Sequence, residues 1–249
     1  MLDSTAQLFI AAAFFVAALL KGITGLGFST IALGFLANAL DPKLAIALVP
    51  LPSIASNLLV MWQTGGFMSA LRRFWPMYLA TLPGLGVGLW LLARTESDGI
   101  GAVLGLTLLL FCGWDTFGSA GPQHAVSERE RVLALPVGFT TGLVNGTTGS
   151  QVMPVLPFLL SLPLDRREFV QAINISFTFS SLIMLAGLVR IGVADSKLLA
   201  VAAASTAPVL AGVWLGGRIR ERLPEVVFRR AVRAVLVVLG LALVVDACS

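Results

Sequence analysis

The apolar residues of this chain gather into eight long runs, and short polar loops separate the runs. The runs cover residues 7–40, 44–63, 75–93, 100–117, 132–160, 169–189, 198–217 and 226–246. A helix that crosses a membrane needs about 20 consecutive apolar residues. Six runs have close to this length, and the pattern predicts six transmembrane helices beside two longer segments of a different form.

The two longer runs, 7–40 and 132–160, are each interrupted by glycine. The first break is Lys21–Gly27, and the second is Gly142–Gly149. At 1.5 Å per residue, the first run as one helix is about 51 Å long, too long for one crossing of a bilayer core and too short for two. Arms of about 10 to 14 residues on each side of a break reach mid-membrane. We therefore expect each run to form a re-entrant hairpin of two half-helices.

The two halves of the chain resemble each other when the sequence is shifted by 124 residues, without a gap. The shift pairs Gly22 with Gly146, Thr24 with Thr148, Gly25 with Gly149, Asp41 with Asp165, Trp90 with Trp214 and Arg94 with Arg218. Internal duplication is common in transporters. We predict one membrane domain, 1–249, with repeat one at 1–118, a cytoplasmic linker at 119–131 and repeat two at 132–249.

The distribution of Lys and Arg predicts how the repeats are oriented. If each hairpin returns to the side from which it entered, the repeats are inverted, and 12 basic residues face one side against 4 on the other. If the long runs cross fully, the repeats are parallel and the split is 10 against 6. Basic loops concentrate on the cytoplasmic side, which favours the inverted arrangement with both termini outside. The first run lacks a basic leader, and we expect it to be retained.

The composition excludes several classes of protein. Apolar residues make up 57% of the 249 residues and charged residues only 12%, whereas soluble domains carry about 25% charged residues. We therefore expect an all-α polytopic membrane protein and no soluble enzyme. The basic excess lies in the loops and does not indicate a nucleic-acid partner. Cys112, Cys248 and the single His124 form no metal or redox motif, and we expect no cofactor and no metal.

The glycine breaks are the predicted substrate site. Irregular backbone at membrane depth occurs only where it is buried in protein or lines a cavity. Half-helices that begin near Phe28 and near Ser150 would point free N–H groups at an anion. The candidate substrate-binding residues are Lys21, Thr24, Gly25, Ser29, Asn57, Asn145, Thr148, Gly149, Ser150, Gln151 and Asn174.

Lys21 is the only charged residue near a predicted membrane centre. A charge there is costly, which favours a position facing a cavity; the alternative is a side chain that extends toward the interface. The glycines have an alternative role in close helix packing. Further polar residues follow on the next helix of each repeat, as walls of the same cavity: Pro50, Pro52, Ser53, Ser56 and Asn57 in the first, and Gln171, Asn174, Ser176 and Ser180 in the second.

At these residues the chain resembles the sulfite exporter TauE/SafE family, also known as the toluene sulfonate uptake permeases. The resemblance rests on the motif from Lys21 to Phe28, the second glycine break at 142–149 and the two-copy layout. It implies transport, commonly export, of sulfur-containing anions such as sulfite, sulfonates or sulfoacetate. The family's second copy usually has more glycine after the break, where this chain has Ser150 and Gln151, so the substrate is left open.

We therefore expect a multi-pass secondary transporter of the bacterial inner membrane. Its anion binds at the midplane between two half-helix tips and moves by alternating access. A passive anion channel is the main alternative, an intramembrane enzyme is a weaker one, and a scaffold without substrate leaves the polar breaks unexplained. The expected partners are the lipid bilayer and the anion. A coupled proton or sodium ion and a homodimer are left open.

Overall fold

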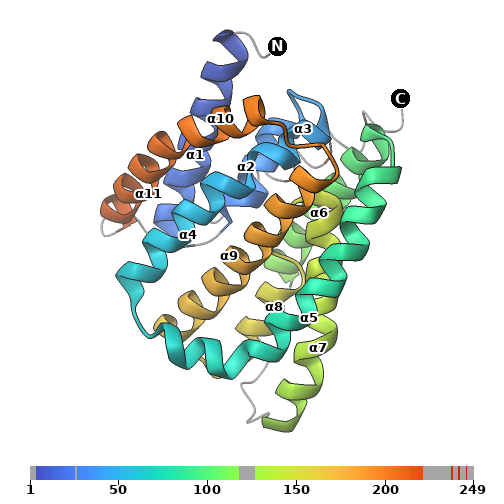
Figure 1. Ribbon diagram of the computed structural model, residues 1–249. Coiled ribbons are helices and arrows are strands. Elements are labelled where there is room, and N and C mark those ends of the chain that lie inside the picture. Colours follow the sequence, from blue (N-terminus) through green and yellow to red (C-terminus); the bar gives the residue numbers. More distant parts are fainter. Residues whose placement is uncertain are drawn as a thin grey trace.

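The computed structural model describes residues 4–25, 27–117 and 127–220, together with positions 237, 241 and 245. Within these ranges the chain is helical and contains no strand (Figure 1). The helices are α1 (Ser4–Thr24), α2 (Phe28–Ala37), α3 (Pro42–Leu48), α4 (Pro50–Thr64), α5 (Phe67–Arg94), α6 (Ser97–Phe117), α7 (Ser127–Thr148), α8 (Val155–Leu160), α9 (Arg166–Arg190), α10 (Ser196–Ala204) and α11 (Thr206–Arg220).

Five helical segments of the described residues are long and apolar enough to cross a membrane. They are Thr5–Ile23, Pro42–Thr64, Phe67–Arg94, Arg167–Arg190 and Ser196–Ile219. Two shorter apolar helices, Phe28–Ala37 and Gly99–Leu110, accompany them. The chain is therefore a multi-pass membrane protein with an all-helical fold. Apart from the three isolated positions, the last predicted run, 226–246, lies outside the described residues.

The first glycine break separates two helices of unequal length. Gly25 and Gly27 have left-handed backbone conformations, with φ of 83° and 85°, which glycine adopts without a steric penalty. The arm after the break, α2, has 10 residues, within the expected range. The arm before it, α1, has 21 residues, so the expectation of a short first arm is wrong. At 1.5 Å per residue, α1 matches the thickness of a bilayer core.

The second break differs more from its prediction. Helix α7 has 22 residues, and it starts at Ser127, inside the stretch expected to be linker. The following helix, α8, has only six residues and begins at Val155, so the helix start expected near Ser150 is wrong. Gly149 turns the chain with a φ of 72°, and Pro154, at the N-cap of α8, disfavours a helical residue before it. Residues 150–153 are therefore non-helical.

Two helix pairs pack at very short range through glycine. Helix α1 lies against α11, and α5 lies against α7 (Figure 1). A Cβ atom added to Gly84 of α5 would lie 2.0 Å from the carbonyl oxygen of Phe139, and one on Gly216 of α11 would lie 2.2 Å from that of Leu19. Contacts this short exclude any side chain, as at small-residue interfaces of membrane helices.

Residues that the shift pairs have matching structural roles. Gly22 faces Gly216, and Gly146 faces Gly88, with a hypothetical Cβ 2.8 Å from the opposite Cα in both cases. Both members of the aspartate pair accept a hydrogen bond from backbone N–H groups at a helix start, Asp41 for α3 and Asp165 for α9. The matching extends to whole helices, because the shift also relates the pair α1 and α11 to the pair α7 and α5.

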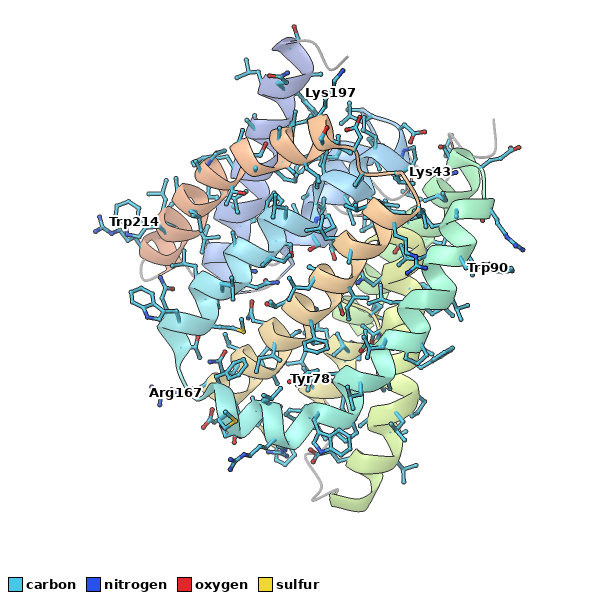
Figure 2. The ribbon with its side chains drawn as sticks, viewed as in Figure 1. Lys43, Tyr78, Trp90, Arg167, Lys197 and Trp214 are labelled. Carbon is cyan, nitrogen blue, oxygen red and sulfur yellow. The ribbon has the colours of Figure 1, made fainter. Side chains whose placement is uncertain are left out.

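The tryptophan and arginine pairs also match. The Arg94 guanidinium lies over the Trp90 ring at 4.1 Å, and that of Arg218 lies over Trp214 at 3.8 Å. Basic residues lie toward both ends of the helical bundle. Figure 2 shows Lys43 and Lys197 toward its upper end and Arg167 toward its lower end. Polar residues of both halves are left in the interior between the packed pairs, where α4 and α9 contact each other.

Candidate functional site

Lys21 lies in the last turn of α1, and its side chain is buried, with 1% of its surface exposed. Its ammonium donates hydrogen bonds to Ser56 Oγ at 3.0 Å and to the amide oxygen of Asn57, both on α4. Hydrogen bonds from a charged donor are stronger than neutral ones and offset part of the cost of burying the charge. The side chain therefore stays inside the protein and does not extend to a surface.

A cavity of about 810 Å³ leads to Lys21 from the surface. Helices α1, α4, α9 and α11 line it, through Lys21, Gly22, Gly25, Val60, Gln63, Thr64, Arg167, Val170, Val213, Trp214, Gly217 and Arg218. The side chains of Gln63, Arg167 and Arg218 are exposed, so the cavity opens to the surface beside them, and the buried Lys21 is part of its wall. All the charged residues that line the described cavity are basic, which makes it attractive to anions.

Beyond Lys21, a network of hydroxyl and amide groups crosses between the two halves of the chain. Ser53 Oγ lies at its centre and accepts hydrogen bonds from Asn57 Nδ2 at 3.5 Å and from Ser181 Oγ at 3.4 Å. Its third neighbour is Ser29 Oγ of α2 at 3.1 Å. Ser181 on α9 in turn accepts from Gln151 Nε2 at 2.7 Å. Five buried residues, from the segments after both glycine breaks and from both wall helices, thus share one polar cluster.

The segments that follow the two glycine breaks touch each other directly. The hydroxyl oxygens of Thr30, in the first turn of α2, and Ser150 lie 3.2 Å apart. The backbone N–H of Ser150 donates to Thr148 Oγ1 at 3.1 Å, which fixes the turn after α7. Gly149 lies against the first half, because a Cβ there would be 3.1 Å from the Leu33 side chain.

One helix N-terminus faces this region as the sequence predicts. Helix α2 begins at Phe28, and Gly27 precedes it without a side-chain cap. The first N–H groups of a helix have no partner within it and favour an anion. The expected second N-terminus is absent, since α8 has a single turn and begins away from Ser150.

Several buried polar atoms in the second half have no hydrogen-bond partner among the described residues. They include both amide atoms of Asn145, Thr141 Oγ1, Ser180 Oγ and the side-chain oxygens of Gln151, Gln171 and Asn174. The Asn174 amide donates to the Val170 carbonyl of its own helix at 2.8 Å. Thr148 Oγ1 likewise donates to Val144 at 2.7 Å. The side chain of Thr24, another predicted site residue, lies outside the described part.

The sequence-based site therefore separates into two groups. Lys21, Ser29, Asn57 and Gln151 belong to one polar cluster, while Asn145 and Asn174 lie in the second half without a link to it. Sequence reasoning missed Arg167 and Arg218 as cavity residues, although Arg218 is a member of a repeated Trp–Arg pair. It assigned Ser53 and Ser56 only to the cavity wall and overlooked Ser181 and Thr141. The signal for Thr141 was its spacing, because residues four positions apart, such as Thr141 and Asn145, lie on the same face of a helix.

Comparison with known proteins agrees with the resemblance in the motifs. The sequence model described as Sulfite exporter TauE/SafE matches residues 10–243 of the 249. No curated protein and no solved structure matches the chain.

Proposed function

Because the chain belongs to the sulfite exporter TauE/SafE family of membrane transporters, we propose that it exports small sulfur-containing anions such as sulfite, sulfonates or sulfoacetate. The observation that carries this proposal is the buried Lys21, which lines a cavity whose other charged residues are also basic. Within the described residues, two acceptors take two of its three protons. The third proton serves the anion, and the bound anion neutralises a buried charge.

The neutral donors around Lys21 would orient the substrate. Ser29, Asn57 and Gln151 carry hydroxyl or amide groups, which suit the oxygens of a sulfite or sulfonate group. The free N–H groups of α2 add donors that do not depend on a side chain. This combination of one buried cation with several neutral donors fits a small oxyanion carrying one or two negative charges.

The position of Arg167 and Arg218, the basic rim of the cavity, supports a direction of transport. If the arginine-rich side is cytoplasmic, as basic loops generally are, the described cavity opens to the cytoplasm. An anion would enter past Arg167 and Arg218 and bind at Lys21. Movement of one repeat against the other would then separate Thr30 from Ser150 and open the opposite side. This is alternating access with the repeats inverted.

Transport by purified protein in liposomes tests the proposal. Liposomes loaded with sulfite, sulfoacetate, sulfate or a carboxylate analogue are diluted into buffer with labelled anion outside. A carrier exchanges the anions, so internal substrate accelerates saturable uptake of the label. Flux that does not saturate, with no acceleration by internal anion, would instead indicate the passive channel. Protein-free liposomes provide the baseline, and no uptake of any sulfur anion would refute the proposed substrate class.

A further inference from the structure

The second half of the chain contains a neutral counterpart of the Lys21 site. The 124-residue shift places Asn145 where Lys21 lies in the first half, and Ser180 where Ser56 lies. The turns that follow are alike, since Gly25 N–H donates to the Lys21 carbonyl at 2.6 Å and Gly149 N–H to the Asn145 carbonyl at 2.7 Å. The two helix ends therefore present the same backbone with different side chains.

The shorter side chain leaves polar groups unpartnered. In the first half, the Lys21 ammonium reaches Ser56 Oγ. In the second half, the Asn145 side chain ends nearer its own backbone, and neither its amide atoms nor Ser180 Oγ has a partner among the described residues. Asn145 is 0% exposed and Ser180 1% exposed. Leaving such groups without partners costs about 1–3 kcal/mol each, which indicates that something fills this place.

The second half also has an additional buried hydroxyl group one helical turn before Asn145. Thr141 precedes Asn145 by one helical turn, is 1% exposed and has an unpartnered Oγ1. Its counterpart under the shift is Ala17, which has no polar side chain. The second half therefore lacks the Lys21 ammonium but has one more oxygen, Thr141 Oγ1, that could bind an ion. The Gln151–Ser181 hydrogen bond links the segment after α7 to the stretch of α9 that holds Ser180.

The electrostatics of the helix end favour a positive charge. The C-terminal end of a helix carries partial negative charge, and Asn145 lies in the last turn of α7. At the equivalent end of α1, this charge is complemented by Lys21. We propose that a small monovalent cation of the sodium class binds between α7 and α9, at Thr141, Asn145 and Ser180, in the place that the Lys21 ammonium takes in the first half.

The chemistry of the ligands fits this class of ion. Hydroxyl and amide oxygens are hard donors, and their neutrality suits a single positive charge better than a divalent ion. Helix C-termini and unwound carbonyls bind coupling ions in other secondary transporters. Only the role of this ion rests on the proposed transport function: an ion bound beside the glycine breaks would couple its own movement to transport of the anion. Binding of the ion itself is measurable without any substrate.

The test is thermal unfolding of the purified full-length protein in detergent, in anion-substrate-free buffer. NaCl is increased while choline chloride keeps the ionic strength constant, and KCl replaces NaCl in a parallel series. We expect a saturable rise in Tm of a few degrees with Na⁺ and a smaller one with K⁺. A Tm that is independent of Na⁺ would mean that water fills the place, and would overturn the proposal.

Two substitutions make the test specific. Asn145→Lys puts an ammonium where the ion binds, so its Tm should no longer respond to Na⁺. Ser180→Ala removes one ligand and should shift the Na⁺ response to higher concentration. Ser205→Ala is the matched control, since Ser205 is a buried serine that donates to its own helix. It should respond as the wild type does. An unchanged Na⁺ response in a folded Asn145→Lys protein would place the ion elsewhere and refute the assignment.

A result that refutes the cation site is distinguishable from one that refutes the proposed transport function. Anion binding at Lys21 is measured separately, by the Tm shift with sulfite in choline buffer. A protein that responds to sulfite and not to Na⁺ retains the anion site and loses only the cation site.

Discussion

The hydroxyl oxygens of Thr30 and Ser150 lie 3.2 Å apart, although the two residues are 120 positions apart in the sequence. Each lies shortly after a different glycine break, so this contact joins the two halves of the chain.

Replacing Lys21 removes the buried positive charge. We expect Lys21→Met to leave the protein folded and to weaken anion binding roughly 10- to 100-fold, the value of a hydrogen bond to a charged group. Lys21→Arg should restore part of the affinity, because a planar fork replaces a compact ammonium. Binding is measured by titration of sulfite or sulfoacetate into purified protein. Lys197→Met, at an exposed position, is the control, and unchanged binding in the Lys21→Met protein would show that the site lies elsewhere.

The glycines with left-handed backbone should not tolerate side chains. Gly25→Val and Gly149→Val are both expected to abolish transport of every anion tested, since the backbone conformation alone costs about 1–2 kcal/mol for a non-glycine residue. A side chain at Gly149 also meets Leu33 and Ile46, whereas Gly25 has open space, so Gly149→Ala should lower Tm more than Gly25→Ala. Gly86→Val, on an open helix face, is the control. Normal transport by either valine protein would indicate a packing role only.

The side chains after the second break should tune selectivity. Ser150→Ala removes the contact with Thr30, and Gln151→Ala removes the donor to Ser181, while both leave the backbone in place. We expect altered relative rates among sulfite, sulfoacetate and sulfate, with total transport retained. Competition assays with pairs of anions measure this ratio. Equal losses for all anions would contradict a role in selectivity.

The basic rim should strengthen the initial attraction of the anion to the cavity. Arg167→Gln and Arg218→Gln are each expected to raise KM roughly two- to fivefold with little change in kcat, because an exposed charge contributes about 0.2–1 kcal/mol. The effect should weaken at high salt. Arg190→Gln, exposed on another part of the protein, provides the comparison. A lower kcat without a change in KM would argue against this role.

The orientation of the repeats is accessible to labelling. Ser69, at the start of α5, and Ser196, at the start of α10, are both exposed, and the inverted arrangement puts them on opposite sides of the membrane. In a protein lacking Cys112 and Cys248, Ser69→Cys should react with an impermeant maleimide only after the cytoplasmic side is opened. Ser196→Cys should react in intact cells. Reaction of both from the same side would reject the inverted arrangement.

The sequence predicts the helices and their breaks well because both depend on local properties. The length of each apolar run indicates which helices cross the membrane. Gly25 and Gly149 have positive φ values, and glycine in the sequence marks positions where the backbone can adopt that conformation. The family was likewise recognisable from the motif at Lys21. The arm lengths were not predictable in this way. Nothing local tells that Ser4 to Thr24 continues as one helix. The prediction of a helix start near Ser150 left out Pro154, whose restriction on the preceding residue agrees with the start of α8 at Val155.

The site was predictable only in part for a similar reason. Lys21 and Asn57 stand out as polar residues in apolar runs, and they do contact each other. The cavity at Lys21 depends instead on how four helices meet, and Arg167 enters it from a loop-proximal turn that resembles many other basic helix ends. Ser53 became the centre of the network through tertiary contacts with Ser29 and Ser181, which no spacing indicates.

The packing of α1 against α11 has a consequence for biosynthesis. Helix α1 is made before the other helices named above, yet the glycine surface it packs against, around Gly216, belongs to α11, the last of them. Helix α7, by contrast, emerges when its partner α5 is already in the bilayer. The interface between α5 and α7 can therefore close first, whereas the side of α1 that faces α11 has no protein partner until α11 is made. Truncation before α11 would leave α1 without its partner, however well the rest of the chain had assembled.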